Sequence, residues 1–384
     1  MSSYGNELEQ IVAELNRAAA TSREPKPESG AARSSASLDQ LLSQAVRRGA
    51  SDLLLIAQAP VTFRVNGSLT PASGPALAPE DTRSLLLPLL TANQHQELQR
   101  NKSVDLCFTR EGIGRFRANL HFQKGTLAGS LRLLPDKMPT LESLHLPPAL
   151  KRLGEARQGL ILVTGATGCG KSSTLAALVD LINTQRRDHV VTIEDPVEYV
   201  HANRNSVVEQ IEVGHDTPDF ATSVRSVLRQ TPDVILVGEM RDAETVATVL
   251  TAAETGHLVL STLHTNDTSQ AVSRILDSFP AGNQPQIRQQ LSLALLAVVA
   301  QQLVPAADKT GRYPAVEIMI ASHAVRNLIR RGEDHQLYTA IGTGRSEGMI
   351  TMEQSLAEMV RSGRITRDTA FAHGFRLEDL GRYL

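Results

Sequence analysis

The sequence has few cysteines and few aromatic residues. Cys107 and Cys169 are the only two cysteines among 384 residues, which excludes a disulfide framework and a zinc site with four cysteine ligands. Tryptophan is absent, and aromatic residues make up 3% of the chain, so the sequence offers no cluster on which nucleic-acid bases would stack. Both cysteines fit a reducing cytoplasm, where we expect the protein to be.

Long hydrophobic runs are also missing. The longest apolar stretch, Leu291–Val304, contains Ser292, Gln301 and Gln302 and is shorter than the roughly 20 residues needed to cross a bilayer. We predict a buried helix there and no direct membrane span. The first ten residues are polar and acidic, unlike a signal peptide. Any membrane association is therefore expected to come through partners.

Charge of one sign does not dominate either. The chain has 39 Lys and Arg against 41 Asp and Glu, for a net charge of −2. This balance gives no general attraction to nucleic acid, and we expect no nucleic-acid partner. A local basic patch would still keep a nucleic-acid translocase open as an alternative. With 41% hydrophobic and 21% charged residues, the composition is that of a globular protein.

Composition divides the chain into three regions. Residues 1–37 are an expected N-terminal appendage and linker, since residues 5–20 have apolar positions at helical spacing and Thr21–Ala36 is rich in polar residues and proline. Two folded domains are expected to follow, at residues 38–150 and 151–384.

The first folded domain has short alternating segments typical of strands. One of them ends in Asn66-Gly67, a strong hairpin signal. The expected elements are a helix at 38–48 and strands at 51–56, 61–67, 114–122 and 129–134. A sheet with helices predicts an α+β domain.

The second domain has near-continuous apolar runs that alternate with helical stretches. Strands are expected at 160–164, 190–193, 234–237 and 258–263, and helices at 172–184, 217–229 and 242–255. This alternation predicts an α/β fold with a parallel sheet covered on both faces, and ligands at the C-terminal strand ends. Residues 286–384 are expected to be mostly helical.

A complete phosphate-binding loop, G-x-x-x-x-G-K-[ST], occupies Gly165–Ser172, between an apolar run and a helix-forming run. Its backbone amides and the following helix N-terminus favour a phosphate chain. Lys171 is expected at the β- and γ-phosphates and Ser172 on Mg²⁺. The chain should therefore bind ATP and Mg²⁺. The expected nucleotide-binding residues are Gly165, Thr167, Gly168, Cys169, Gly170, Lys171, Ser172 and Ser173.

Carboxylates gather where two further strands end. Glu194, Asp195 and Glu198 fall within five residues, and either share a cation and an attacking water or form a solvated acidic loop. The apolar run 234–237 is followed by Glu239, the pattern of a Walker B strand, so Glu239 is expected to hold Mg²⁺ through water.

Two histidines flank the fourth strand. His257 and His264 are seven residues apart, so in a regular strand they point to opposite faces. His264 lies at the C-terminal end of the strand and is the expected sensor of the γ-phosphate. His257 is expected to be either this sensor or a structural histidine.

These four blocks, in this order, resemble the secretion ATPase superfamily and most closely the PilT retraction ATPases of type IV pili. The resemblance runs from about residue 38 to beyond residue 360. The segments that match the family are the loop at 165–173, the acidic segment Thr-Ile-Glu-Asp-Pro-Val-Glu-Tyr (192–199), the Walker B segment at 236–242 and the histidine segment at 256–266.

The resemblance implies a PAS-like first domain, a RecA-like ATPase domain with a helical C-terminal part, and a homo-hexamer. It makes Glu198 the catalytic base and Glu239 the Mg²⁺-associated acid. It also implies that Arg115, Arg117 and Arg132 close on the γ-phosphate, although each is otherwise an ordinary exposed strand arginine.

The resemblance further implies a motor for pilus retraction and twitching motility. The segment Ala324–Ile329 resembles the AIRNLI motif of that family, and the four-cysteine zinc element of extension ATPases is missing. The expected location is the cytoplasmic side of the inner membrane, with a platform protein and a paralogous retraction ATPase as partners. An accessory paralogue of the PilU type, a RecA-like nucleic-acid translocase and a catalytically silent ring subunit remain alternatives.

Overall fold

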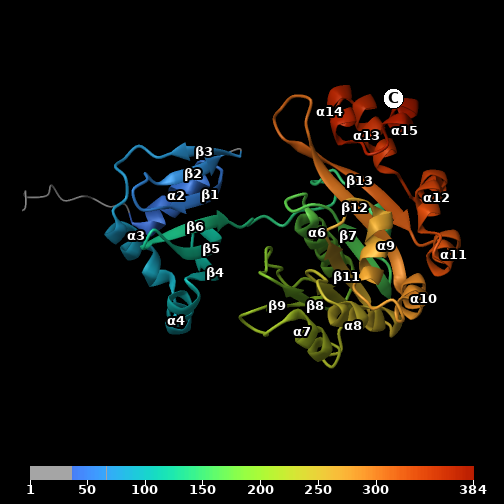
Figure 1. The fold of residues 1–384 in the computed structure, drawn as a ribbon, viewed down its shortest axis with the longest axis horizontal. Helices are drawn as coiled ribbons and strands as arrows, with labels where there is room; N and C mark the ends of the chain where they lie inside the picture. The colour runs from blue at the N-terminus through green and yellow to red at the C-terminus, as the bar shows by residue number, and fades with distance from the viewer. Residues whose placement is uncertain (1–36, 66) are drawn as a thin grey trace, which may run out of the picture. The chain divides into compact units, whose positions relative to one another are not determined.

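The structure is a computed structural model that describes residues 37–65 and 67–384, and it forms two compact units (Figure 1). The first unit runs to Ile113 and includes Arg117–Leu133; the second contains Gly114–Phe116 and Leu134–Leu384. Except for Ser37, the expected appendage lies outside the described residues. The domain bounds at 38–150 and 151–384 stay a prediction.

Within the described residues, the first unit is a six-stranded sheet with three α-helices. The strand order is β3-β2-β1-β6-β5-β4, and β1 pairs antiparallel with both β2 and β6. The strands are β1 (Ala50–Leu55), β2 (Thr62–Val65), β3 (Ser68–Pro71), β4 (Ser103–Arg110), β5 (Gly114–Gln123) and β6 (Thr126–Leu133). The helices are α2 (Leu38–Arg47), α3 (Pro79–Leu86), the 3₁₀ turn η1 (Leu87–Leu89) and α4 (Ala92–Asn101).

Local signals explain much of this unit. Ser37 caps α2, with Gln40 completing a capping box, and alternate residues of β1 such as Leu53 and Leu55 are buried. The predicted hairpin is confirmed, because β2 pairs antiparallel with β3. Its Asn66 lies outside the described residues. Strand β4 was not predicted.

The second unit is built on a seven-stranded sheet in the order β13-β12-β7-β11-β10-β8-β9 (Figure 1). All neighbours are parallel except β13, which pairs antiparallel with β12. The strands are β7 (Gly159–Thr164), β8 (His189–Glu194), β9 (Val207–Glu212), β10 (Val234–Val237), β11 (Leu258–Leu263), β12 (Leu295–Pro305) and β13 (Arg312–Ile320).

Helices surround this sheet and continue to the C-terminus. They are α5 (Ala149–Leu153), α6 (Lys171–Gln185), α7 (Phe220–Val227), α8 (Ala243–Glu254), α9 (Thr268–Asp277), α10 (Gln284–Ala294), α11 (His323–Arg331), α12 (Leu337–Thr343), α13 (Met352–Arg361), α14 (Arg367–His373) and α15 (Leu377–Tyr383). Two 3₁₀ turns, η2 (Asp334–Gln336) and η3 (Arg345–Glu347), lie between them. None of the helices in the described ranges is long and apolar enough to cross a bilayer.

Both faces of the sheet are covered. In β7, Leu160 and Leu162 belong to the core that contains residues of α8, α9, α10 and α11. Ile161 and Val163 belong to the other core, with α6. Every residue of β7, β10 and β11 is buried, as expected of parallel strands covered on both sides. The predicted α/β fold class is confirmed, and α6 and α9 lie on opposite faces of the sheet.

The predicted buried helix at Leu291–Val304 is wrong beyond Ala294. Helix α10 ends there, and the chain continues as β12, which pairs with β7 on one side and β13 on the other. A fully buried strand is as continuously apolar as a buried helix, so the run alone could not separate the two. The segment 286–384 was expected to be mostly helical. It contains the two strands β12 and β13, which lie between helix α10 and the helical part from α11 onward.

A buried carboxylate on β13 holds the start of α9. Glu317 is 4% exposed, and its Oε1 accepts hydrogen bonds from the backbone N of Thr268 at 2.9 Å and from its hydroxyl at 2.7 Å. Burial raises the pKa of Glu317 above its ordinary value, against the effect of these hydrogen bonds. The folded state therefore holds this proton more tightly than the unfolded chain does. The resulting stabilisation is full at low pH and is lost as the pH rises through the raised pKa.

Glu317→Gln should therefore be at least as stable as the parent chain at pH 7, because the amide oxygen can still accept both hydrogen bonds without a buried charge. Glu317→Ala should be less stable by about 1–3 kcal/mol, since Thr268 loses its buried acceptor. Thermal unfolding midpoints of the three proteins at pH 5 and pH 7 measure this. Equal losses in both variants at pH 7 would show that the charge itself is needed.

Candidate functional site

The phosphate loop joins the end of β7 to the start of α6. Gly165, Gly168 and Gly170 have φ of +143°, +79° and +94°, in a region that favours glycine. A Cβ on Gly165 would lie 2.3 Å from the backbone oxygen of Gln301, and one on Gly170 would lie 2.8 Å from its Nε2. The loop is thus pressed against β12, and these two glycines have no room for a side chain.

The other predicted loop residues differ in exposure. Thr167 and Gly168 are exposed at the tip of the loop, and Ser172 is half-buried in the first turn of α6. The Ser173 hydroxyl forms a hydrogen bond of 2.8 Å with the Tyr199 hydroxyl. Ser173 therefore ties the first turn of α6 to the acidic segment after β8.

Lys171 is buried and folds back over the loop. Its Nζ donates to the backbone oxygens of Gly165 at 2.8 Å and Ala166 at 3.1 Å. Burial lowers the pKa of Lys171, while electrostatic interactions with Cys169, Glu239 and Glu198 oppose this shift. The structure thus brings Lys171 into electrostatic range of both predicted acidic residues, which come from different strands.

Cys169 is a buried part of the loop. Its side chain is 6% exposed, and burial raises the pKa of the thiol, so the neutral thiol is favoured. Its backbone oxygen accepts a hydrogen bond of 2.7 Å from Gln301 Nε2.

Gln301 is the site residue that the sequence did not single out. It is 5% exposed on β12, and besides its bond to Cys169 its Oε1 accepts a 2.8 Å hydrogen bond from the Thr174 hydroxyl on α6. The β12 residue before it, Ala300, pairs with Thr164 at the end of β7, which places Gln301 beside the loop. The sequence did contain a signal, since a glutamine inside an apolar run is unusual. Because the run was predicted to be a helix, Gln301 was not placed beside the phosphate loop.

The acidic segment after β8 separates its carboxylates. Glu194 is half-buried and accepts hydrogen bonds from the Thr192 hydroxyl at 2.8 Å and from Gln210 Nε2 at 3.3 Å. Burial raises the pKa of Glu194. Asp195 is exposed, and Glu198 is half-buried near Lys171. Of the three carboxylates, Glu194 is thus hydrogen-bonded to its own strand and to β9. Glu198 instead interacts electrostatically with Lys171.

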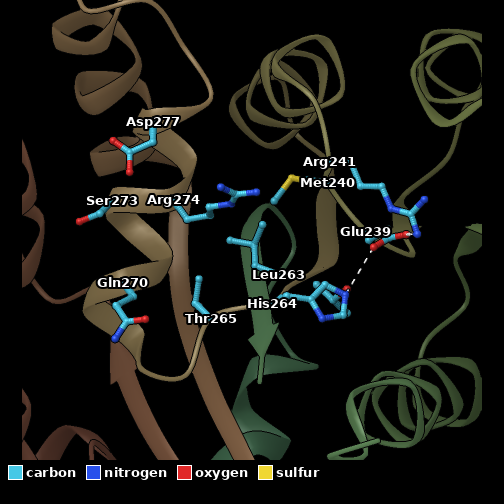
Figure 2. Close-up of a pocket in the computed structure, with 11 residues that line it drawn as sticks. Glu239, Met240, Arg241, Leu263, His264, Thr265, Gln270, Ser273, Arg274 and Asp277 are labelled. Atoms are coloured by element: carbon cyan, nitrogen blue, oxygen red, sulfur yellow. Dashed lines mark ion pairs between the residues drawn. The ribbon is translucent and has the colours of Figure 1, made fainter. Parts of the chain in front are cut away.

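Glu239 follows β10 and contacts an arginine and a histidine side chain. Its Oε1 forms an ion pair with Arg241, and its Oε2 lies 3.5 Å from His264 Nε2 (Figure 2). His264 is at the C-terminal end of β11, as predicted. His257 precedes β11, and its Nδ1 lies 3.0 Å from the backbone oxygen of Ala252, so it caps the end of α8.

The three predicted arginines have different surroundings. Arg115, in the second unit, pairs with Glu212 at 3.2 Å and donates to the backbone oxygen of Val197, the residue before Glu198. In the first unit, Arg132 pairs with Asp52 at 2.8 Å and Arg117 is half-buried on β5. A role at the γ-phosphate stays a prediction for all three.

A positioning role for Gln301 is testable with its neighbour as control. Gln301→Leu should lower ATP turnover at least about tenfold, because the Cys169 oxygen and the Thr174 hydroxyl lose a buried partner, at about 1–3 kcal/mol each. Gln302 is on the same strand but donates to the backbone oxygen of His373 on α14, so Gln302→Leu should keep turnover within about threefold. Steady-state kinetics on both variants decide the matter; equal effects would remove Gln301 from the site.

Comparisons with known proteins agree with this geometry. A family model described as Type II/IV secretion system protein matches residues 28–371. The Type IV pilus ATPase PilU of Pseudomonas aeruginosa is 40% identical over 342 residues, covering 89% of this chain and 90% of that protein. The Type IV pilus retraction ATPase PilT of the same bacterium is 41% identical over 333 residues, covering 87% and 96%.

A solved structure adds the fold. The crystal structure of the pilus retraction motor PilT with bound ADP has a TM-score of 0.84 at 42% identity, covering 90% of this chain and 99% of that one. The fold and the loop thus define a P-loop ATPase that hydrolyses ATP. The chain belongs to the type II/IV secretion system family, within its PilT and PilU pilus ATPases.

Proposed function

We propose that this protein is the ATP-driven motor that retracts type IV pili by depolymerising pilin. The main support is that Glu198 and Glu239, which follow two different strands, both lie within electrostatic range of Lys171 in the phosphate loop. The chain is also 41% identical to PilT over most of both lengths. We further propose that it works as a homo-hexamer on the cytoplasmic side of the inner membrane, where it acts on a platform protein of the pilus machine.

The loop fits the phosphates of ATP. Three glycines with positive φ and the start of a 15-residue helix favour an anion, and Lys171 can exchange its two backbone carbonyl acceptors for phosphate oxygens. The Ser172 hydroxyl and the Glu239 carboxylate would hold Mg²⁺, which neutralises phosphate charge when it is bound.

Glu198 is the proposed general base. Glu194 is a poor candidate, because it already accepts hydrogen bonds from Thr192 and Gln210. Glu198 follows Val197, whose backbone oxygen is held by Arg115 and whose backbone N donates to Glu212 at 3.0 Å. These contacts fix the segment from which Glu198 would orient and deprotonate the attacking water.

We propose that His264 senses the γ-phosphate through Glu239, which it contacts at 3.5 Å. Arg117 and Arg132 would supply positive charge to the transition state, and Arg115 would do so after releasing Glu212.

Glu198→Gln should bind ATP but lower turnover at least about 100-fold, because general-base catalysis contributes about 10²–10⁴ in rate. Glu194→Gln is the matched control; its amide fits a site that already disfavours the charged form, so turnover should stay within about fivefold. Phosphate production, together with the nucleotide retained after gel filtration, measures both effects. The reverse order of the two variants would name Glu194 as the base.

Helix α11 contains the segment that resembles the AIRNLI motif. Val325 and Ile329 are buried, while Arg326 is tied to backbone oxygens of Ala321, Ser292 and Leu293. Asn327 is exposed on the same helix. Arg326 therefore has a structural role at the end of α10, and Asn327 is the polar position that is free to couple the ATPase to pilus disassembly.

An accessory role beside a paralogous retraction ATPase is the second candidate, because identities of 40% to PilU and 41% to PilT favour neither. The two are distinguished by whether this chain supports retraction alone. A nucleic-acid translocase is disfavoured by the net charge of −2 and the 3% aromatic content.

Imaging of labelled pili in a deletion strain tests the proposal. Cells without the chain should extend pili but fail to retract them. Asn327→Ala should restore ATPase activity within about threefold of the parent but not retraction, whereas Thr339→Ala, an exposed polar control on α12, should restore both. Absence of pili from the deletion strain would indicate an extension motor. Normal retraction with Asn327→Ala would remove α11 from the coupling.

A further inference from the structure

A pocket of about 770 Å³ opens between α9 and the C-terminal ends of β10 and β11 (Figure 2). Glu239 and His264 line one side of it, and Gln270, Ser273 and Arg274 line the other. The phosphate loop contributes no residue to this pocket. The pocket therefore adjoins the catalytic residues without being the nucleotide site itself.

The pocket and the phosphate loop belong to opposite sides of the sheet. Helix α6, which follows the loop, packs on the face of β7 formed by Ile161 and Val163, whereas α9 packs on the other face. Glu239 is common to both regions, since it acts on Lys171 and also lines the pocket. Glu239 and its partner His264 thus separate the expected γ-phosphate position from the pocket.

One arginine of the pocket, Arg274, lies outside the ion pairs of Glu239 and offers a site for an anion. Among the described residues that line the pocket, both ion pairs involve Glu239, with Arg241 and with His264. Arg274 extends from α9 toward Met240 and is not part of either pair (Figure 2). The Ser273 hydroxyl lies on the same helix and can also donate, whereas the Gln270 amide already donates to Asp267 Oδ2 at 2.6 Å. The lining contains one further carboxylate besides Glu239. This is Asp277, one turn beyond Arg274, and its negative charge opposes anion binding.

The walls of the pocket are fixed from behind. Asp267 caps α9, with its Oδ1 accepting from Gln270 N at 2.8 Å, and Glu317 holds Thr268 from β13. The Thr262 hydroxyl donates to the backbone oxygen of Gly238 at 2.6 Å, which joins the ends of β10 and β11. By contrast, the His264–Glu239 contact of 3.5 Å is longer than an ordinary hydrogen bond.

We propose that this pocket binds inorganic phosphate and is the route by which the phosphate formed in ATP hydrolysis leaves the site. Hydrolysis of ATP by one water gives ADP, phosphate and a proton, so the route adds no other reactant. Phosphate passes Glu239 and His264 and is received by Arg274. The inference rests on the proposed position of ATP at Lys171.

The first arm of the test measures inhibition of steady-state ATPase activity by added inorganic phosphate. Arg274→Gln should raise the inhibition constant about 10- to 100-fold, the effect of losing a charge-assisted hydrogen bond. Arg274→Lys should retain part of the affinity, and Asp277→Asn should lower the constant. Arg367→Gln, an exposed arginine on α14, should match the parent chain. An unchanged constant in both Arg274→Gln and Asp277→Asn would overturn the proposal.

The second arm separates product phosphate from bulk phosphate. In a single turnover, quench measurement of ATP cleavage and a fluorescent phosphate reporter give the rates of chemistry and of release. Arg274→Gln should change release relative to cleavage; an unchanged ratio would overturn the exit route, even if bulk phosphate binds. Failure of the parent chain to hydrolyse ATP would instead overturn the proposed function, so the two failures are distinguishable.

Discussion

The phosphate loop is held from behind by β12, and the rest of the site depends on this contact. Gly165 packs against the backbone of Gln301 with no room for a Cβ, and the Gln301 side chain binds both the loop and α6. The loop conformation is therefore set by the strand inserted beside β7. A buried amide with both ends satisfied is well suited to this, since it fixes geometry without adding charge next to Lys171.

The β12–β13 pair supports both halves of the site. Gln301 on β12 holds the loop, and Glu317, paired with Ala300 in the register, holds the start of α9. The loop lies with α6 on one face of the sheet, whereas α9 lies on the other. One antiparallel pair at the sheet edge therefore positions the nucleotide side and the pocket side together, with Glu239 between them.

The sequence predicted the elements whose signals are local. The loop, the strand before it and Glu239 follow from short motifs, and the buried parallel strands follow from continuous apolar runs. Gln301 was missed because its role depends on which strand lies beside β7, a long-range property. Strand β9 was missed because its exposed Glu209 and part-exposed neighbours interrupt the apolar pattern. The pocket at Arg274 depends on tertiary packing and has no sequence signature.

The central claim is that Lys171, Glu198 and Glu239 surround the terminal phosphate of ATP. A structure of the chain with a non-hydrolysable ATP analogue and Mg²⁺ tests this most directly. Lys171 Nζ should leave the backbone oxygen of Gly165, where it now lies at 2.8 Å, and bond to phosphate oxygens, with Glu198 facing the γ-phosphate. A nucleotide that leaves Lys171 on Gly165, or that places its γ-phosphate away from Glu198, would contradict the account.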